Sequence, residues 1–145
     1  MRRRLILALL AAPCIAIAQP ASSGKRIGFL SPMTPAQAAE SVEGFRQGLR
    51  EHGYVEGSNI AIEYRFAEHK FDRLPGLAAE LVRLRVEVLV TVVTQASVAA
   101  KSATSAIPIV MAADPDPVRS GFVVSLARPG GNITGLSTLA PDLEA

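Results

Sequence analysis

Residues 86–93 have the sequence VEVLVTVV, and this stretch decides the fold. It is almost continuously apolar and β-branched, without the polar alternation of a strand that faces water on one side. Such a run is typical of a central parallel strand that is buried on both faces. Because strand-like and helix-like segments lie on both sides of it in the chain, we expect an α/β sheet built around it.

Four further segments have the pattern of strands. Residues 25–31 carry an apolar cluster before a Ser-Pro turn, and residues 59–66 alternate apolar and polar side chains, as a half-covered edge strand does. Residues 107–113 form an apolar run before a rigid Asp-Pro-Asp-Pro turn, and residues 133–137 follow a Pro-Gly-Gly-Asn connection. The sequence therefore predicts five strands.

Four helices are predicted between these strands, over residues 35–52, 72–84, 95–104 and 121–127. The first three have a cap residue at their start, whose side chain can accept the free amide hydrogens of a first turn: Thr34 before residue 35, Asp72, and Thr94 before residue 95. Gln37, three residues after Thr34, completes a capping box. Apolar side chains then recur at spacings of three and four residues, which predicts one buried face in each of the first two helices.

Strands and helices alternate, with connections too short for antiparallel pairing. This alternation predicts a parallel sheet with right-handed crossovers and helices on both faces, a three-layer sandwich with strand order 2-1-3-4-5. In such sheets ligands bind beyond the carboxyl ends of the strands, near the point where the strand order reverses. The loops that begin at Ser31, Thr94 and Asp114 are therefore the candidate binding loops.

The first eighteen residues have the three zones of a secretory signal peptide. Three arginines precede an apolar stretch, and Ala16 and Ala18 supply the small side chains that signal peptidase requires, so we expect cleavage after Ala18. Twin-arginine export stays open, whereas a lipoprotein anchor would need a small residue where Pro13 precedes Cys14. A bilayer span would need roughly 20 apolar residues, more than this run has. The mature protein is expected in the periplasm.

Loss of the signal peptide changes the charge balance. Three of the fifteen Lys and Arg residues leave with it, so that twelve remain against thirteen Asp and Glu. No basic stripe is left that would indicate a nucleic-acid partner. Because Cys14 is the one cysteine, the mature chain has no disulfide, thiol nucleophile or cysteine metal site.

Polar residues at the ends of the third and fourth strands are the candidate ligand contacts. Thr94 and Gln95 offer a hydroxyl, an amide and the free N–H groups of a helix start, which suit a carboxylate. Asp114 and Asp116 can pair with a substrate ammonium, but each also precedes a proline, where an Asp commonly initiates a turn. With Ser31 these residues form the predicted ligand site, which suits a zwitterion.

No catalytic, metal or cofactor site is predicted. His52 and His69 lie at a helix end and in a loop, away from the strand ends, as solvated surface histidines do. The first strand is not followed by a glycine-rich phosphate-binding loop. Ser125 and Ser137 lack the flanking residues of a nucleophile elbow. We therefore expect a small-molecule binder rather than an enzyme.

Three segments together resemble a known family. They are GFRQGL at 44–49, GYVEGSNI at 53–60 and SLARPGGNITG at 125–135, and the last is the most specific. They are similar to the ABC transporter substrate-binding proteins often described as tryptophan/tyrosine-type, which have the type I periplasmic binding fold. The resemblance runs from about Lys25 to the last residue.

The resemblance implies a two-lobed protein that binds a small solute, such as an aromatic amino acid, between its lobes and delivers it to an ABC permease. The family's Asp-Pro motif after the fourth strand matches Asp116-Pro117, and its Thr after the third strand matches Thr94. Gln95 and Ser97 stand where the family often has Pro and Ala, and Asp114-Pro115 is an unusual addition. These departures bear on which solute is bound.

The same resemblance sets the expected domain organisation. Residues 1–18 are the signal peptide, 19–24 a flexible linker, 25–137 the N-terminal lobe, and 138–145 the start of a crossover to an absent second lobe. The chain then corresponds to a fragment or truncated form. Because one lobe offers half of the contacts and has nothing to close against, we expect weak or undetectable solute affinity from this chain alone.

Three other classes stay open on the sequence. The effector domain of a transcription regulator shares this lobe, but a leader occupies the place of its DNA-binding head. A secreted α/β enzyme would need a nucleophile paired with a base. A secreted ligand-sensing or partner-binding α/β domain has no transport role, and a lobe that binds only a protein partner would show no stabilisation by solutes.

Overall fold

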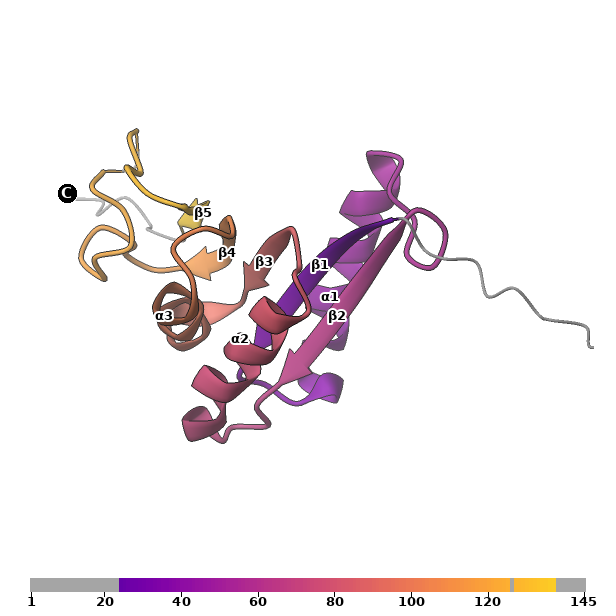
Figure 1. Ribbon diagram of the computed structural model, residues 1–145, viewed down its shortest axis with the longest axis horizontal. Helices are drawn as coiled ribbons and strands as arrows, with labels where there is room; N and C mark the ends of the chain where they lie inside the picture. Colours follow the sequence, from indigo (N-terminus) through magenta and orange to yellow (C-terminus); the bar gives the residue numbers. More distant parts are fainter. Residues whose placement is uncertain (1–23, 126, 138–145) are drawn as a thin grey trace, which may run out of the picture.

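A five-stranded parallel sheet organises the chain (Figure 1). The computed structural model describes residues 24–125 and 127–137. In chain order the elements are β1 (Lys25–Ser31), α1 (Pro35–Glu51), β2 (Ile60–Phe66), the 3-10 helix η1 (Phe71–Arg73), α2 (Leu74–Arg83), β3 (Val88–Thr91), α3 (Val93–Ala103), β4 (Ile109–Asp114) and β5 (Ile133–Ser137). The expected signal peptide with its cleavage site after Ala18, most of the expected linker, and residues 138–145 lie outside the described residues.

The strand order is β2-β1-β3-β4-β5, as predicted, and all neighbouring strands are parallel. β3 lies in the middle, where Val90 is beside Phe29 of β1 and Val110 of β4. Leu89 is fully buried and Val90 is 7% exposed. The prediction of a doubly covered central strand is confirmed, although its paired segment is shorter than residues 86–93.

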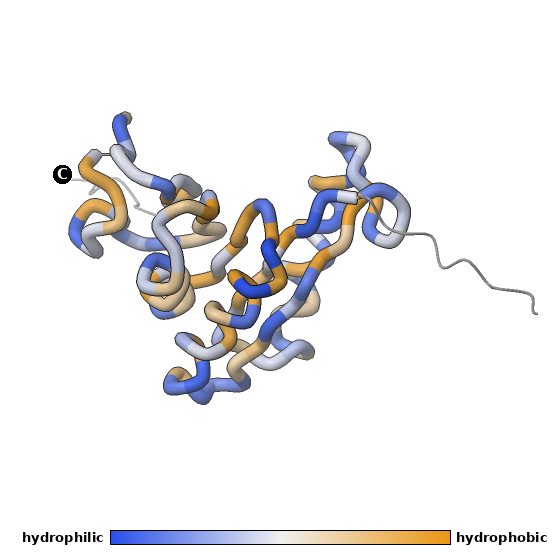
Figure 2. Tube along the Cα trace, in the orientation of Figure 1, coloured by the Kyte–Doolittle hydropathy of each residue, from blue (hydrophilic) through white to orange (hydrophobic). Residues whose placement is uncertain are grey.

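Helices cover both faces of the sheet, which gives three layers (Figure 1). The core between the sheet and α1 contains Phe29, Ala38, Val42, Ile60, Ile62, Val90 and Val92. The core under α2 and α3 includes Leu30, Leu77, Leu81, Leu89, Ala96, Ala100, Ile109 and Met111. In Figure 2 the central strands are mainly hydrophobic, whereas β2 at the edge alternates between hydrophobic and hydrophilic colours. The α/β three-layer architecture is therefore confirmed.

The first helix begins as its sequence predicts. The Thr34 hydroxyl accepts a hydrogen bond from Gln37 N at 3.3 Å, and Gln37 Oε1 accepts one from Thr34 N at 3.1 Å. This reciprocal pair is the predicted capping box, with Pro35 at the start of the helix. The helix ends at Glu51 and His52 forms its C-cap.

The prediction that Asp72 caps the second helix is wrong. Asp72 lies inside the 3-10 turn, in which Arg73 N donates to Lys70 O at 2.9 Å. α2 starts after this turn, at Leu74, and no side chain in the described part of the chain caps it. The helix start is therefore set by the preceding turn rather than by the aspartate.

The prediction that Thr94 caps the third helix is also wrong. α3 starts at Val93, so Thr94 already belongs to its first turn. The Thr94 hydroxyl donates instead to Asp114, twenty residues further along the chain. The side chain that the local pattern assigned to a helix cap therefore makes a tertiary hydrogen bond instead.

The predicted helix over residues 121–127 is not found in the described part of that segment. Gly121 has a φ of 70°, and Phe122 N closes a turn by donating to Pro117 O at 2.9 Å. Phe122 and Val123 are 6% and 7% exposed. Two adjacent side chains therefore anchor this segment on the core, whereas a helix would bury residues three or four apart.

A substitution at Leu89 tests how much the central strand contributes to the stability of the fold. Leu89→Ala should lower the free energy of unfolding by about 2–5 kcal/mol, because it leaves a cavity in a fully buried site. The matched control is Leu136→Ala in β5, since the Leu136 side chain is 70% exposed and its loss should change stability by less than about 0.5 kcal/mol. Urea denaturation measures both variants, and equal effects would contradict the central position of β3.

Gly135 in the PGGN-T-G segment lets β5 approach β4. It has a φ of 151°, and a Cβ there would contact Met111 O and lie 2.6 Å from Met111 N. Gly135→Ala should therefore destabilise the fold by about 1–3 kcal/mol. Gly131→Ala is the control, because a Cβ at Gly131 would meet nothing within 4 Å. Thermal unfolding distinguishes them, and a Gly135→Ala variant as stable as Gly131→Ala would refute the close approach.

Candidate ligand-binding site

The candidate binding loops lie along one edge of the sheet. Because all five strands are parallel, the loops after β1, β3 and β4 leave the sheet at its carboxyl edge. Ser31 ends β1, Thr94 and Gln95 lie in the first turn of α3, and Asp114 ends β4 with Asp116 two residues beyond. β1 and β3 are also where the strand order reverses.

The strongest contact at this edge joins α3 to β4. Thr94 Oγ1 donates to Asp114 Oδ2 at 2.7 Å, and Asp116 N donates to Asp114 Oδ1 at 2.9 Å. Asp114 is fully buried, so these two bonds satisfy both oxygens of a carboxylate that water does not reach. The carboxylate therefore holds the α3 start and the Asp114-Pro115-Asp116 turn in one arrangement.

The turn between β3 and α3 carries backbone strain. Val93 has a φ of 62°, a region that a β-branched residue rarely occupies and that costs on the order of 1–3 kcal/mol. Two buried hydroxyls hold the turn: Thr91 Oγ1 and Ser97 Oγ are 2.8 Å apart, and Ser97 Oγ donates to Val93 O at 3.3 Å. This sharp turn brings Thr94 to the carboxyl edge of the sheet.

Gln95 and Asp116 are the more accessible members of the predicted site. Gln95 is exposed, and within residues 24–125 and 127–137 its side chain makes no hydrogen bond. No side chain of the described residues caps α3, so its first-turn N–H groups are open to an anion. Asp116 is half-buried, and its Oδ1 accepts from Arg119 N at 2.9 Å, the turn-initiating role that the sequence also allowed.

Ser31 has a different environment from the other four. Its side chain is fully buried, and its Oγ accepts from Met33 N at 3.2 Å, which shapes the loop after β1. The neighbouring loop after β2 bonds to the same segment, with Ala67 N donating to Ser31 O at 2.9 Å and His69 Nε2 lying 2.7 Å from Gln37 Oε1. Thr94, Asp114 and Asp116 are thus joined by hydrogen bonds, whereas Ser31 belongs to the adjacent loop.

An apolar cavity of about 300 Å³ adjoins Thr94 and Gln95. It is lined by Phe71, Leu74, Pro75, Thr94, Gln95, Val98, Ala99 and Ser102. Phe71 is 52% exposed and Val98 is 51% exposed, although both are large and apolar. Sequence reasoning missed these two residues. Their signal was weak, because Phe71 lies outside the apolar stripe of α2 and Val98 lies on the outer side of α3.

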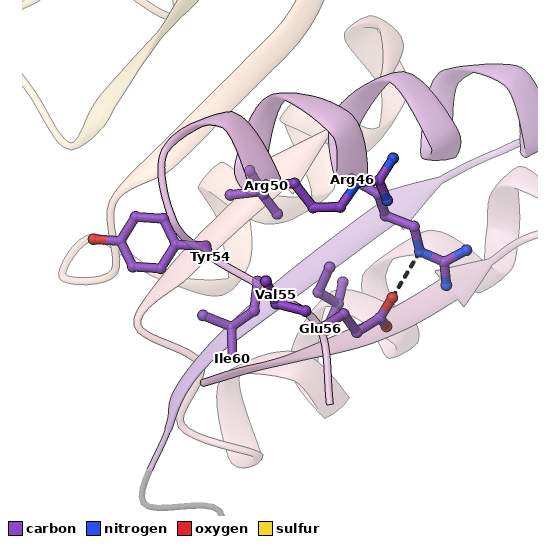
Figure 3. Close-up of a pocket in the computed structure, with 8 residues that line it drawn as sticks. Arg46, Arg50, Tyr54, Val55, Glu56 and Ile60 are labelled. Carbon is purple, nitrogen blue, oxygen red and sulfur yellow. Dashed lines mark hydrogen bonds and ion pairs between the residues drawn. The ribbon is translucent and has the colours of Figure 1, made fainter. Parts of the chain in front are cut away.

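A smaller cavity, of about 170 Å³, lies at the opposite end of the sheet (Figure 3). Arg46 Nε donates to Glu56 Oε2 at 2.6 Å and to the Tyr64 hydroxyl at 3.1 Å, which ties α1 to the loop before β2. Burial, and then the negative charge of Glu56, raise the pKa of Tyr64 above its usual value. The charged groups that line this cavity already have partners, because Arg46 binds Glu56 and Arg50 donates to Glu43 at 2.7 Å. We therefore assign this cavity a structural role.

Neither a metal centre nor a membrane span is found in the described part of the chain. Residues 24–125 and 127–137 contain no group of three His, Cys, Asp or Glu side chains able to hold a metal ion. None of their helices has the length and apolar character to cross a bilayer.

A parallel sheet of order 2-1-3-4-5 with helices on both faces is the architecture of one lobe of a periplasmic binding protein. The particular family follows from the sequence. The model of the family described as "ABC transporter substrate binding protein" matches residues 27–144, so this chain belongs to that family. The resemblance inferred from the three motifs is thereby confirmed.

The chain is similar to a curated relative and to solved structures. It is 34% identical over 113 residues to a tyrosine-binding protein of Clostridioides difficile. The aligned region covers 78% of this chain and 33% of the relative. A ligand-free, open structure of a substrate-binding protein with adhesive properties from Clostridium difficile is 29% identical, with a TM-score of 0.73, over 78% of this chain and 38% of that one.

A Streptococcus pneumoniae ABC domain solved with L-Trp is also similar. It is 30% identical, with a TM-score of 0.73, over 79% of this chain and 39% of that one. The chain thus spans between a third and two fifths of the length of these relatives.

The Thr94–Asp114 bond can be tested by a near-isosteric change. Thr94→Val should lower the free energy of unfolding by about 1–3 kcal/mol, because it leaves a buried carboxylate oxygen without a donor. Thr94→Ser keeps the hydroxyl and should retain most of the stability. Thr134→Val, at an exposed position, is the control for the substitution itself. Denaturant unfolding measures all three, and a harmless Thr94→Val would show that the bond does not hold the site.

Proposed function

We propose that this chain supplies one half of the solute-binding cleft of a bacterial ABC importer, and that the solute is an amino acid with an aromatic side chain. The observation that carries the proposal is that the uncapped start of α3 is joined through Asp114 to the Asp116 turn and also lines an apolar cavity with Thr94 and Gln95. Relatives described as binding tyrosine and L-Trp support the solute class.

The two charged ends of the solute are assigned to two loops. The carboxylate would accept from the first-turn N–H groups of α3 and from the Gln95 amide, where the helix dipole favours an anion. The ammonium would donate to Asp116 and to Thr94 Oγ1, which gives its own hydrogen to Asp114 and keeps its lone pairs free. Asp114 and Ser31 would act at this site by positioning these loops.

The side chain of the solute is assigned to the cavity between Phe71 and Val98. Its volume of about 300 Å³ is at the lower end of the usual range for small-molecule sites. An aromatic ring there would cover the exposed apolar surfaces of Phe71 and Val98 and make ring contacts with Phe71. An aliphatic solute of similar size would lose those ring contacts.

The family and the expected signal peptide support a role in transport. We propose that the signal peptide over residues 1–18 directs export to the periplasm, that residues 25–137 form the N-terminal lobe, and that residues 138–145 lead toward a second lobe. Closure of two lobes around the solute would present it to the permease. A single lobe supplies one side of that cleft, which accounts for the expected weak affinity of the chain alone.

A thermal-shift titration of the chain joined to a second lobe tests the proposal. L-Tryptophan or L-tyrosine should raise the unfolding temperature with increasing concentration, because a ligand that binds the folded state stabilises it by mass action. Gln95→Ala should weaken the apparent affinity about tenfold by removing one hydrogen bond to a charged group. Gln47→Ala, an exposed glutamine on α1, is the matched control and should bind normally.

Two results would contradict the proposal. No stabilisation by any amino acid, together with stabilisation by a protein partner, would remove the solute-binding role. Solute binding that Gln47→Ala and Gln95→Ala leave equally unaffected would place the cleft elsewhere in the lobe.

A further inference from the structure

We infer that the outer edge of β2 is a pairing surface for a second copy of this chain, in an antiparallel strand-to-strand dimer. β2 ends the sheet, and within residues 24–125 and 127–137 no strand lies beyond it. An edge strand presents unpaired N–H and C=O groups, which are a template for another chain unless they are covered. The inference does not depend on solute binding.

Backbone hydrogen bonds show which residues of β2 face outward. Ile60 N donates to Val55 O at 3.4 Å, and Ile60 O accepts from Gly57 N at 2.9 Å. The backbone N–H and C=O of Ile60 therefore point away from β1. The direction alternates along a parallel strand. The N–H and C=O groups of Ile62, Tyr64 and Phe66 therefore also point outward.

The outward edge is self-complementary in one antiparallel register. When Tyr64 faces Tyr64 of the second copy, Ile62 faces Phe66, and all three outward residues of each copy enter hydrogen-bonded pairs. Tyr64 O then accepts from the second copy with its second lone pair, beside the bond that Arg65 Nη1 donates to it at 2.8 Å. In this register Glu63 of each copy stands opposite Arg65 of the other. Opposite charges and aromatic–β-branched neighbours directly across an antiparallel pair are stabilising.

The neighbouring registers are disfavoured by charge. Sliding one strand by two residues in one direction places Glu63 opposite Glu63 of the second copy. Sliding it in the other direction places Arg65 opposite Arg65. Since like charges directly across a strand pair repel, the Tyr64-centred register is the one that the strand specifies.

Within residues 24–125 and 127–137, both charged residues make ion pairs but keep part of their hydrogen-bonding capacity. Glu63 forms ion pairs with Arg26 Nε at 3.8 Å and with Arg65 Nη1 at 3.9 Å, both longer than a hydrogen bond. Arg65 uses Nε for Glu80 at 2.9 Å and Nη1 for Tyr64 O at 2.8 Å, while its Nη2 has no hydrogen bond to the described residues. Each copy therefore offers one acceptor and one donor at the positions that the register requires.

A groove of about 410 Å³ follows the same edge on the α1 side. Its lining consists of Pro35, Ala39, Val42, Glu43, Arg46, Tyr64 and Phe66. The Tyr64 and Phe66 rings in it are stacked, with centroids 6.2 Å apart. A twofold axis perpendicular to the sheet places Ile62 and Tyr64 of the second copy on this face, where their apolar surfaces extend the aromatic row.

Sedimentation equilibrium with charge-reversed variants tests the dimer. The chain should self-associate as its concentration rises toward about 1 mM. Glu63→Arg and Arg65→Glu, each alone, should weaken the dimer at least about tenfold, because both cross-strand pairs become repulsive. An equimolar mixture of the two variants should dimerise again, since arginines of one copy then face glutamates of the other.

The mixture also guards against misfolding, because unfolded variants would not restore pairing to each other. Glu40→Arg, at an exposed position of α1, is the control and should leave the dimer unchanged. A wild-type chain that stays monomeric, single variants that stay dimeric, or a mixture that stays monomeric while the wild type pairs would each overturn the inference.

Amide exchange provides a readout without any substitution. The N–H groups of Ile62, Tyr64 and Phe66 should gain protection as the chain concentration rises. Those of Ala61, Glu63 and Arg65 already face β1 and should change little. Equal changes in both sets, or none in the first, would overturn the β2 interface.

Discussion

The burial of β3 on both faces is the constraint from which the rest of the structure follows. A strand with Leu89 on one side and Val90 on the other is stable only if both faces of the sheet are covered. Parallel neighbours satisfy this condition, because each crossover carries a helix back over a face. The same crossovers bring the loops after β1, β3 and β4 to one edge, so the location of the candidate cleft is a consequence of how the core is formed.

The candidate site depends on a short chain of buried polar contacts at that edge. Asp114 would be costly to bury alone, yet its two oxygens accept from Thr94 and from the Asp116 backbone. The strained Val93 turn is held by the Thr91–Ser97 pair. Together these contacts leave the α3 start and the exposed Gln95 side chain without a competing partner among the described residues, which is a suitable arrangement for binding a charged group.

The contacts at β2 and at β5 have different roles in the lobe. The hydrogen bonds of Arg46 with Glu56 and with the Tyr64 hydroxyl hold α1 on β2 and on the loop before it. Along the outer edge of β2, the Glu63 and Arg65 side chains keep part of their hydrogen-bonding capacity. On the far side of the sheet, Gly135 allows β5 to close against β4, so the family's glycine signature has a packing explanation here.

The sequence by itself determined the features that depend on neighbours along the chain. The apolar run at residues 86–93, the strand alternation and the Thr34–Gln37 capping box specify elements and their order, because periodicity and caps act over a few residues. Only the tertiary structure decided those features in which contacts between distant residues replace the locally predicted ones. The Thr94 hydroxyl binds Asp114 rather than its own helix, Phe122 and Val123 replace a helix by an anchored loop, and Phe71 and Val98 line one cavity, since each arrangement depends on packing that no local pattern records.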